Sequence, residues 1–457
     1  MSSLQALNSY RAKSISLFFP FILVAVISGI NIILGIGRDM VLTAKFGASS
    51  DLDAFLLGFN FIRTLGIQVA ISTSNILVPV FIPLWLNNQL NAISEISIRW
   101  MRTTSHFLLF CLLLLSFFPQ QIARWLGPGL SDDGQQVLVK TLLLLAPLLF
   151  IFIIEGNLKA FADSRKSYAL HGAFLSFIPV GIIVGTILGA DKWGTTSTAI
   201  GVVLGAFSGL AILVGVLIGK FANQFSMLTK APKTAGKNPE IIAINFIPYT
   251  AFGLMLISSL LIITQGIIER AFASQLSPGS VVIYSLAISI LGIPSALLIP
   301  SLSAILLPTF VYRQTLPVSK KFYRKFGLLK NELMLIIGLF ILLTSFFWIG
   351  SEKIVDLLFL HGNFPQSAAQ QTATTVKGLS ISLIGYGLTT VFRQALISQK
   401  KIFADLIICC LITLLTVSLL NILVPRFGLI GLVIEGIVTM TSSAGLYAMV
   451  LKFGRPQ

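Results

Sequence analysis

The stretch GIGRDMVLTAKFGASSDLDAF, Gly35–Phe55, ends the first long apolar run of the sequence and is unusually rich in charge. Ionisable side chains are rare inside membrane-spanning helices, because each costs about 3 kcal/mol at the bilayer centre. Arg38 and Lys45 are seven positions apart, which places them on one face of a helix. Asp39 points about 100° away from Arg38. The stretch therefore predicts a charged face at the end of an otherwise apolar helix.

The composition indicates an integral membrane protein. Of 457 residues, 55% are hydrophobic and 11% are charged, and the mean hydropathy is +0.92. A soluble domain has about a quarter of its residues charged. The chain offers repeated apolar runs of about 20 residues, the length that crosses a bilayer as a helix.

These runs predict an all-α fold, a polytopic membrane protein with about 12 transmembrane helices. The expected spans are 16–46, 52–86, 104–121, 138–160, 167–189, 196–221, 243–275, 280–311, 328–350, 371–397, 402–424 and 427–452. We keep the basic N-terminus as part of the first span, because its apolar run is too long for a signal peptide and no cleavage site follows it.

A weak internal repeat predicts two lobes. NILVPVFI (75–82) and AILLPTFV (304–311) occupy equivalent places in the second helix of each half, and the pairs Arg38–Asp39 and Glu269–Arg270 precede them. Both halves start from the same side, so we expect a parallel pseudo-repeat of two six-helix lobes around a central cavity. The expected domains are an N-terminal lobe at 1–225, a cytoplasmic linker at 226–242 and a C-terminal lobe at 243–457.

The basic residues predict the orientation. If the N-terminus is inside, the predicted outer segments hold only Arg124, Lys192, Lys353 and Arg426, and the other connections are rich in Lys and Arg. This bias places both termini in the cytoplasm. The net charge of +16 then faces an anionic leaflet, and no nucleic-acid partner is needed to explain it.

Several chemistries are not expected. No phosphate-binding GxxxxGK[ST] motif occurs in the sequence. The three cysteines lie in apolar runs without CxxC spacing, and the three histidines do not share ligand spacing, so we expect no metal site and no disulfide. No nucleophile–base pair is visible, so we expect no catalytic residues and no enzyme activity.

Charged residues inside the spans are the candidate functional residues. Arg38, Arg63 and Arg270, drawn from both halves, would line a wet positive cavity, and guanidinium groups match the oxygens of a phosphate or pyrophosphate. Lys45, Lys377 and Arg393 lie near predicted helix ends, where they could equally extend to the membrane interface. Glu155 and Glu435 could each bind a proton or a cation, or simply accept a hydrogen bond from a neighbouring helix.

The opening stretch resembles the first-helix signature of the MurJ (MviN) lipid II flippase family, within the MOP transporter superfamily. Further segments agree with that family in order: LGPGL (126–130), APLLF (146–150), NLKAF (157–161), ERAFASQLSPGSV (269–281), LGIPSALLIPSLSAILLP (291–308), LFLHGNF (358–364) and NILVPRFGLIGL (421–432). Each motif is weak alone, but together they cover nearly the whole chain.

The resemblance implies a flippase that moves an undecaprenyl-pyrophosphate-linked saccharide to the outer leaflet by alternating access. It marks Arg38, Asp53 and Arg63 as substrate-binding positions. It marks Glu269 and Asn421 as ion-coupling positions, to which we add Glu435. No cofactor is expected, and coupling to Na⁺, to H⁺ or to the membrane potential stays open. The expected partners are the anionic lipid substrate and membrane lipids, with the protein acting as a monomer.

The sequence departs from the family pattern at two cationic positions. Arginines expected in helices one and eight read Ile32 and Ser289. Fewer cationic groups leave an alternative substrate open, the lipid-linked unit of an exopolysaccharide or an O-antigen. A MATE-like antiporter of small solutes is a further alternative.

Overall fold

The computed structural model describes residues 23, 26–86, 89–165, 167, 169–220, 249–295, 298, 330–399 and 401–453. Within these ranges every regular element is helical, and nine helices are long and apolar enough to cross a membrane. The all-α membrane fold is therefore confirmed. The predicted linker at 226–242 and the repeat segment at 304–311 lie outside the described residues.

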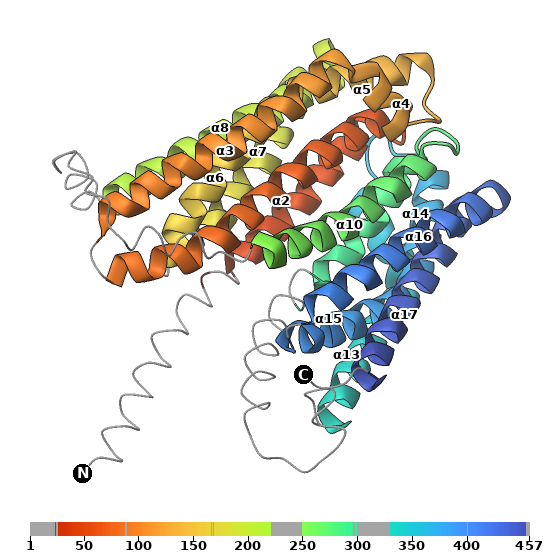
Figure 1. The fold of residues 1–457 in the computed structure, drawn as a ribbon. Coiled ribbons are helices and arrows are strands. Elements are labelled where there is room, and N and C mark those ends of the chain that lie inside the picture. Colours follow the sequence, from red (N-terminus) through yellow and green to blue (C-terminus); the bar gives the residue numbers. More distant parts are fainter. Residues whose placement is uncertain are drawn as a thin grey trace. The chain divides into compact units, whose positions relative to one another are not determined.

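Figure 1 shows the helices, most of which overlap the predicted spans. The helix Leu90–Phe117 begins well before the predicted span 104–121. A first helix occupies Val26–Phe46, and a shorter apolar helix occupies Ser280–Ser295. The labelled helices of the first half are α2 (Ser50–Leu86), α3 (Leu90–Phe117), α4 (Pro119–Leu126), α5 (Asp132–Leu145), α6 (Pro147–Ser164), α7 (Ala169–Trp193) and α8 (Thr195–Lys220). Those of the second half are α10 (Tyr249–Ala273), α13 (Lys330–Phe359), α14 (Gln366–Leu379), α15 (Ser382–Ser398), α16 (Ile402–Phe427) and α17 (Leu429–Phe453).

Two predicted spans are each built from two helices. The span at 138–160 consists of α5 and α6, which meet at Ala146 because Pro147 has no N–H to continue the hydrogen-bond ladder. The span at 371–397 consists of α14 and α15, where Ser380 and Ser382 turn their hydroxyls back onto carbonyls of the preceding turn. Such local side-chain hydrogen bonds compete with regular helix geometry.

Contacts divide the chain into two compact units. Unit 1 comprises Met1–Arg38, Phe61–Pro119 and Lys140–Ile247, and unit 2 comprises Asp39–Asn60, Gln120–Val139 and Pro248–Gln457. Unit 2 thus joins segments of the N-terminal half to the C-terminal half. The predicted lobes follow the chain continuously and stay a prediction.

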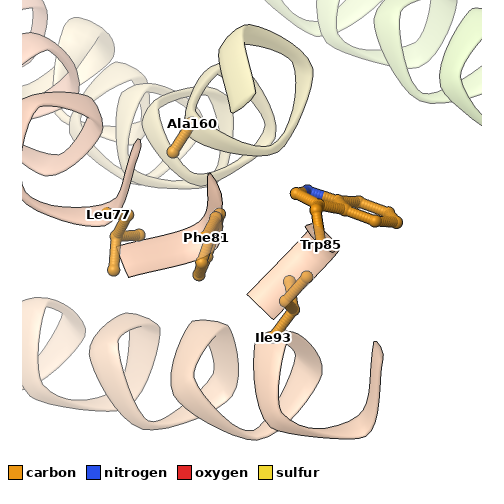
Figure 2. Packing of buried hydrophobic residues seen from close by; sticks show 5 residues of the cluster. All are labelled: Leu77, Phe81, Trp85, Ile93 and Ala160. Atoms are coloured by element: carbon orange, nitrogen blue, oxygen red, sulfur yellow. The ribbon is translucent and has the colours of Figure 1, made fainter. Parts of the chain in front are cut away.

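Unit 1 is held together by small residues and by one apolar cluster. Gly181 of α7 and Gly201 of α8 lie so close that a Cβ on either would come within 2.2 Å of the other's carbonyl oxygen. Small residues of this kind let membrane helices approach closely. Figure 2 shows the apolar cluster, where side chains of α2, α3 and α6 meet; its buried members are Leu77, Phe81, Trp85, Ile93 and Ala160.

Unit 2 contains a buried ion pair between α15 and α16. The Arg393 guanidinium donates to both oxygens of Asp405, over 2.9 and 3.0 Å, and Tyr447 of α17 donates to the same carboxylate over 2.6 Å. Asp405 is 2% exposed. The contact explains Arg393, which the sequence left open: its guanidinium is paired with Asp405 across two helices.

We expect Asp405→Ala to destabilise the protein by about 3 kcal/mol, because it leaves a guanidinium partly buried without its carboxylate. Thermal unfolding of the purified protein in detergent measures the effect. Asp356→Ala, which removes an exposed carboxylate from α13, is the matched control and should change the melting temperature little. Equal effects of the two substitutions would contradict a structural role for the pair.

Candidate functional site

Asp53 caps a helix that lies far away in the sequence. Its two carboxylate oxygens accept hydrogen bonds from the backbone N–H groups of Gly279, over 2.6 Å, and of Val282, over 2.8 Å. Gly279 directly precedes the helix Ser280–Ser295, and Val282 belongs to its first turn. At this end of a helix the N–H groups lack partners within the helix, and the helix dipole favours a negative charge. Asp53 is 2% exposed, and its predicted role in substrate binding stays a prediction.

The turn before Asp53 is anchored to the loop at 358–364. Gly47 has φ +64°, a conformation that favours glycine, and a Cβ there would lie 2.6 Å from the Asn363 carbonyl oxygen. The Asn363 side chain donates to the Lys45 carbonyl, and its backbone N–H donates to the Ala44 carbonyl, each over 2.9 Å. The opening stretch and the LFLHGNF segment therefore form one packed structure in unit 2.

The LGPGL segment reaches the same part of unit 2. Gly129 donates its N–H to the Ser274 hydroxyl over 3.4 Å, and a Cβ at Gly129 would lie 2.0 Å from the Ser274 carbonyl oxygen. The segment that contains Ser274 also reaches the opening stretch, because Gly279 packs against Ala48. Four segments quoted from the sequence, which begin at residues 35, 126, 269 and 358, thus contact one another in pairs.

Two acidic residues of unit 2 lie near each other inside the helical bundle. Glu269 of α10 accepts a hydrogen bond from the Tyr284 hydroxyl over 2.7 Å, and it interacts electrostatically with Glu435 of α17. Glu435 is 0% exposed. Its Oε1 accepts from the Thr439 hydroxyl over 2.7 Å, whereas its Oε2 has no hydrogen-bond partner among the described residues. Two carboxylates placed in this way favour a cation or a proton between them.

Asn421 does not join this acid pair in the described contacts. Its side chain is exposed, and its amide donates over 2.8 Å to the Val417 carbonyl one turn earlier on α16. The acid pair instead faces Thr416 on the same helix, a buried hydroxyl that makes no hydrogen bond of normal geometry with described residues. The ion-coupling role of Asn421 stays a prediction.

Arg270 supplies a guanidinium next to the acid pair. One of its terminal nitrogens donates to the Gly266 carbonyl over 2.7 Å, and its buried Nε has no hydrogen-bond partner among the described residues. It also interacts electrostatically with Glu269. Arg38 and Arg63 are half-buried and belong to unit 1, whereas Arg270 belongs to unit 2. The cavity shared by the three arginines stays a prediction.

Unit 1 holds a polar cluster that the sequence reading recognised only in part. The sequence indicates Glu155 as a candidate but not its partner. His171 Nδ1 of α7 lies 2.5 Å from Glu155 Oε1. One turn further along α6, Lys159 contacts Asp163 and the Ser74 hydroxyl. The partners His171 and Tyr284 could not be found from spacing, because each lies on a different helix from its acid. Within the described ranges no group of three or more His, Cys, Asp or Glu residues could hold a metal ion.

Two solved structures of membrane proteins share the fold of this chain. A structure described as lipid II flippase MurJ in an inward closed conformation superposes with a TM-score of 0.74 at 20% identity, and covers 94% of this chain and 87% of that one. An inward-facing MATE family transporter of the MOP superfamily superposes with a TM-score of 0.67 at 13% identity, over 93% and 96% of the two chains. The fold is therefore that of the polytopic MOP transporters.

The sequence narrows this class to one family. The family model for the lipid II flippase MurJ matches residues 42–454, and the chain belongs to this family. Probable lipid II flippases MurJ of Borreliella burgdorferi and Treponema pallidum are each 25% identical to it. The first alignment covers 95% of this chain and 83% of the relative, and the second covers 87% and 74%.

We expect Asp53→Ala to destabilise the protein by about 1 to 2 kcal/mol, the usual effect of losing an N-cap. The reason is that the N–H groups of Gly279 and Val282 lose their acceptor. Asp51→Ala removes an exposed carboxylate from the same turn of α2 and is the matched control. Thermal unfolding of the purified variants compares the two. A loss in Asp51→Ala as large as that in Asp53→Ala would refute the capping role.

Proposed function

We propose that this chain is a lipid II flippase, which moves a polyprenyl-pyrophosphate-linked peptidoglycan precursor from the inner to the outer leaflet of a bacterial plasma membrane. The family match over residues 42–454 carries the proposal. It is supported by relatives whose names state this activity and by a membrane fold common to transporters. The proposal assigns transport, and no catalysed reaction, to the chain.

In this proposal the arginines hold the pyrophosphate. Arg38, Arg63 and Arg270 are half-buried residues in or beside spanning helices, where a guanidinium is costly unless it serves a polar cavity. The buried Nε of Arg270, which lacks a partner among the described residues, offers a donor for a phosphate oxygen. The polyprenyl tail would remain in the surrounding lipid while the head group crosses.

The contacts around Asp53 would form the outer closure of an alternating-access cycle. With both termini in the cytoplasm, as the basic residues predict, the turn at 47–49 faces the outer surface. Asp53, Gly47 and Asn363 then hold outer helix ends together. Opening to the outside would require breaking the two hydrogen bonds of Asp53, and the exposed N–H groups would bind water instead.

The acid pair is the proposed coupling site. A cation or a proton bound between Glu269 and Glu435 would neutralise their repulsion, so occupancy would change the packing of α10 against α16 and α17. The membrane potential is a second source of energy, because moving one charge across 100 mV is worth about 2.3 kcal/mol.

A second candidate substrate is another lipid-linked oligosaccharide of the same chemical class. Ile32 and Ser289 stand where the family resemblance leads us to expect arginines, which favours a cavity with fewer cations. The pyrophosphate and the polyprenyl tail would be recognised in the same way, and the saccharide would differ.

We expect this chain to rescue a bacterium depleted of its own lipid II flippase, and Arg270→Ala to abolish the rescue. The reason is the loss of a cation that binds the pyrophosphate. Lysis is scored at equal membrane levels of each variant, with Arg38→Ala and Arg63→Ala tested beside it. Arg124→Ala, an exposed arginine in α4, is the control and should rescue. Absence of rescue by the parent chain would favour the second substrate.

We expect Glu435→Gln to reduce the dependence of flipping on an imposed Na⁺ or H⁺ gradient, because an amide cannot bind a cation or a proton as a carboxylate does. The measurement is the rate of flipping of fluorescent lipid II in proteoliposomes with each gradient in turn. Glu352→Gln, an exposed glutamate of α13, serves as the control. If Glu435→Gln responds to every gradient as the parent does, the acid pair does not couple transport to ions.

A further inference from the structure

Glu155 and His171 form a buried acid–histidine pair in unit 1. The Glu155 side chain is 0% exposed and the His171 side chain 17% exposed, and His171 Nδ1 lies 2.5 Å from Glu155 Oε1. The two residues lie in the candidate membrane spans Asp132–Ser164 and Leu170–Trp193. A short contact between an imidazole nitrogen and a carboxylate oxygen requires one proton between them.

The second oxygen of Glu155 distinguishes this pair from a purely structural contact. Glu155 Oε2 is buried and has no hydrogen-bond partner among the described residues. Leaving a buried acceptor without a partner costs about 1 to 3 kcal/mol. A carboxylate that serves packing alone would be expected to use both oxygens, as Asp405 does. Within the described residues, His171 therefore makes the one hydrogen bond that reaches the Glu155 carboxylate.

The backbone around the pair is fixed by a neighbouring helix. Asn31 of the first helix donates over 2.9 Å to the Gly172 carbonyl, next to His171, and accepts from the Ser176 hydroxyl over 2.8 Å. On the other side, Gly156 packs against Ala70 of α2, where a Cβ would come within 2.7 Å. These contacts fix the backbone next to both Glu155 and His171.

The charged groups on the surrounding helices have other described contacts or lie further along their helices. On α6 itself, Lys159 contacts Asp163 and Ser74. At the end of α8, Lys220 donates to Ser167, and on α3 the exposed His106 bonds to the Arg102 carbonyl.

Other charged residues of these helices lie about 10 Å or more from the pair along their helix axes. Asp191 and Lys192 are about 30 Å from His171 along α7, at a rise of about 1.5 Å per residue. On α2, Arg63 is two turns, or about 10 Å, before Ala70. On the first helix, Arg38 and Asp39 follow Asn31 by about 10 Å or more. Among the described contacts, His171 is the titratable group that touches the Glu155 carboxylate.

We propose that Glu155 and His171 form a proton-binding site in the N-terminal half, separate from the acid pair of α10 and α17. In the loaded state one proton lies between Oε1 and Nδ1 and a second is bound to Nε2, so the pair is neutral overall and only the second proton is released. On release the proton passes to water through the partly exposed imidazole, which leaves a carboxylate beside a neutral imidazole. No oxidant, reductant or other reactant takes part.

The site can link proton binding to helix packing. The unloaded pair carries one negative charge in an interior of low dielectric, where an unpaired charge is costly. Loss of the proton therefore favours an arrangement of α6 and α7 that admits water to Glu155. A role of this proton in transport rests on the proposed flippase function. Proton binding by the pair does not depend on that function.

Proton binding is tested without any transport assay. The chain has three histidines, so the ring ¹⁵N signals of histidine-labelled protein in nanodiscs can be assigned with His171→Gln and, as control, His106→Gln. We expect the His171 signal to change protonation state between about pH 5 and pH 9, and Glu155→Gln to shift that transition. A His171 signal that is constant over this range, or unaffected by Glu155→Gln, would overturn the proposal.

The use of this proton in transport is tested by a ratio of rates. Flipping of fluorescent lipid II in proteoliposomes is measured with and without a pH gradient, and we expect the ratio to fall to about one in Glu155→Gln and in His171→Gln, because the group that binds the transported proton is lost. Glu95→Gln, an exposed glutamate on α3 that pairs with Arg99, should keep the parent's ratio. A parent that does not flip at all, together with a titrating His171, would reject the proposed function and retain the proton site. A gradient response retained by both variants would overturn the transport role.

Discussion

A polar group inside the membrane must find its partner within the protein, because no water is available there. This constraint governs how the chain uses its few charged residues. Asp53 is satisfied by two backbone N–H groups of a distant helix, and Asp405 is satisfied by Arg393 and Tyr447. In both cases the acid joins segments that apolar packing alone would align only loosely.

The opening stretch has its effect through this constraint. Gly47 allows the chain to turn tightly against Asn363, and the turn delivers Asp53 to the helix that begins at Ser280. Gly47 and Asp53 thereby link the first helix and α2 to the segment at 358–364 and to the helix that begins at Ser280.

The sequence predicted the fold better than it predicted the contacts. Apolar runs of sufficient length gave the spans, because length and hydropathy are local properties. The partner of Asp53 lies 226 residues away, and no local pattern encodes that distance. The rotation of each helix about its axis was also missed: Asn421 and Glu435 both lie in spans, yet Asn421 is exposed and Glu435 is buried. Rotation depends on the packing of neighbouring helices, which a single sequence shows only weakly.

Four of the buried acids fall into two groups by how many of their carboxylate oxygens accept hydrogen bonds. Asp53 and Asp405 each accept hydrogen bonds with both carboxylate oxygens. Glu155 and Glu435 each use one oxygen and leave the other without a partner among the described residues. An incompletely bonded acid is costly in one protonation state, and binding a proton or a cation removes that cost. Among the described residues, Glu155 in the first half and Glu435 in the second are therefore suited to reversible binding, and the two sites could respond to different stages of a transport cycle.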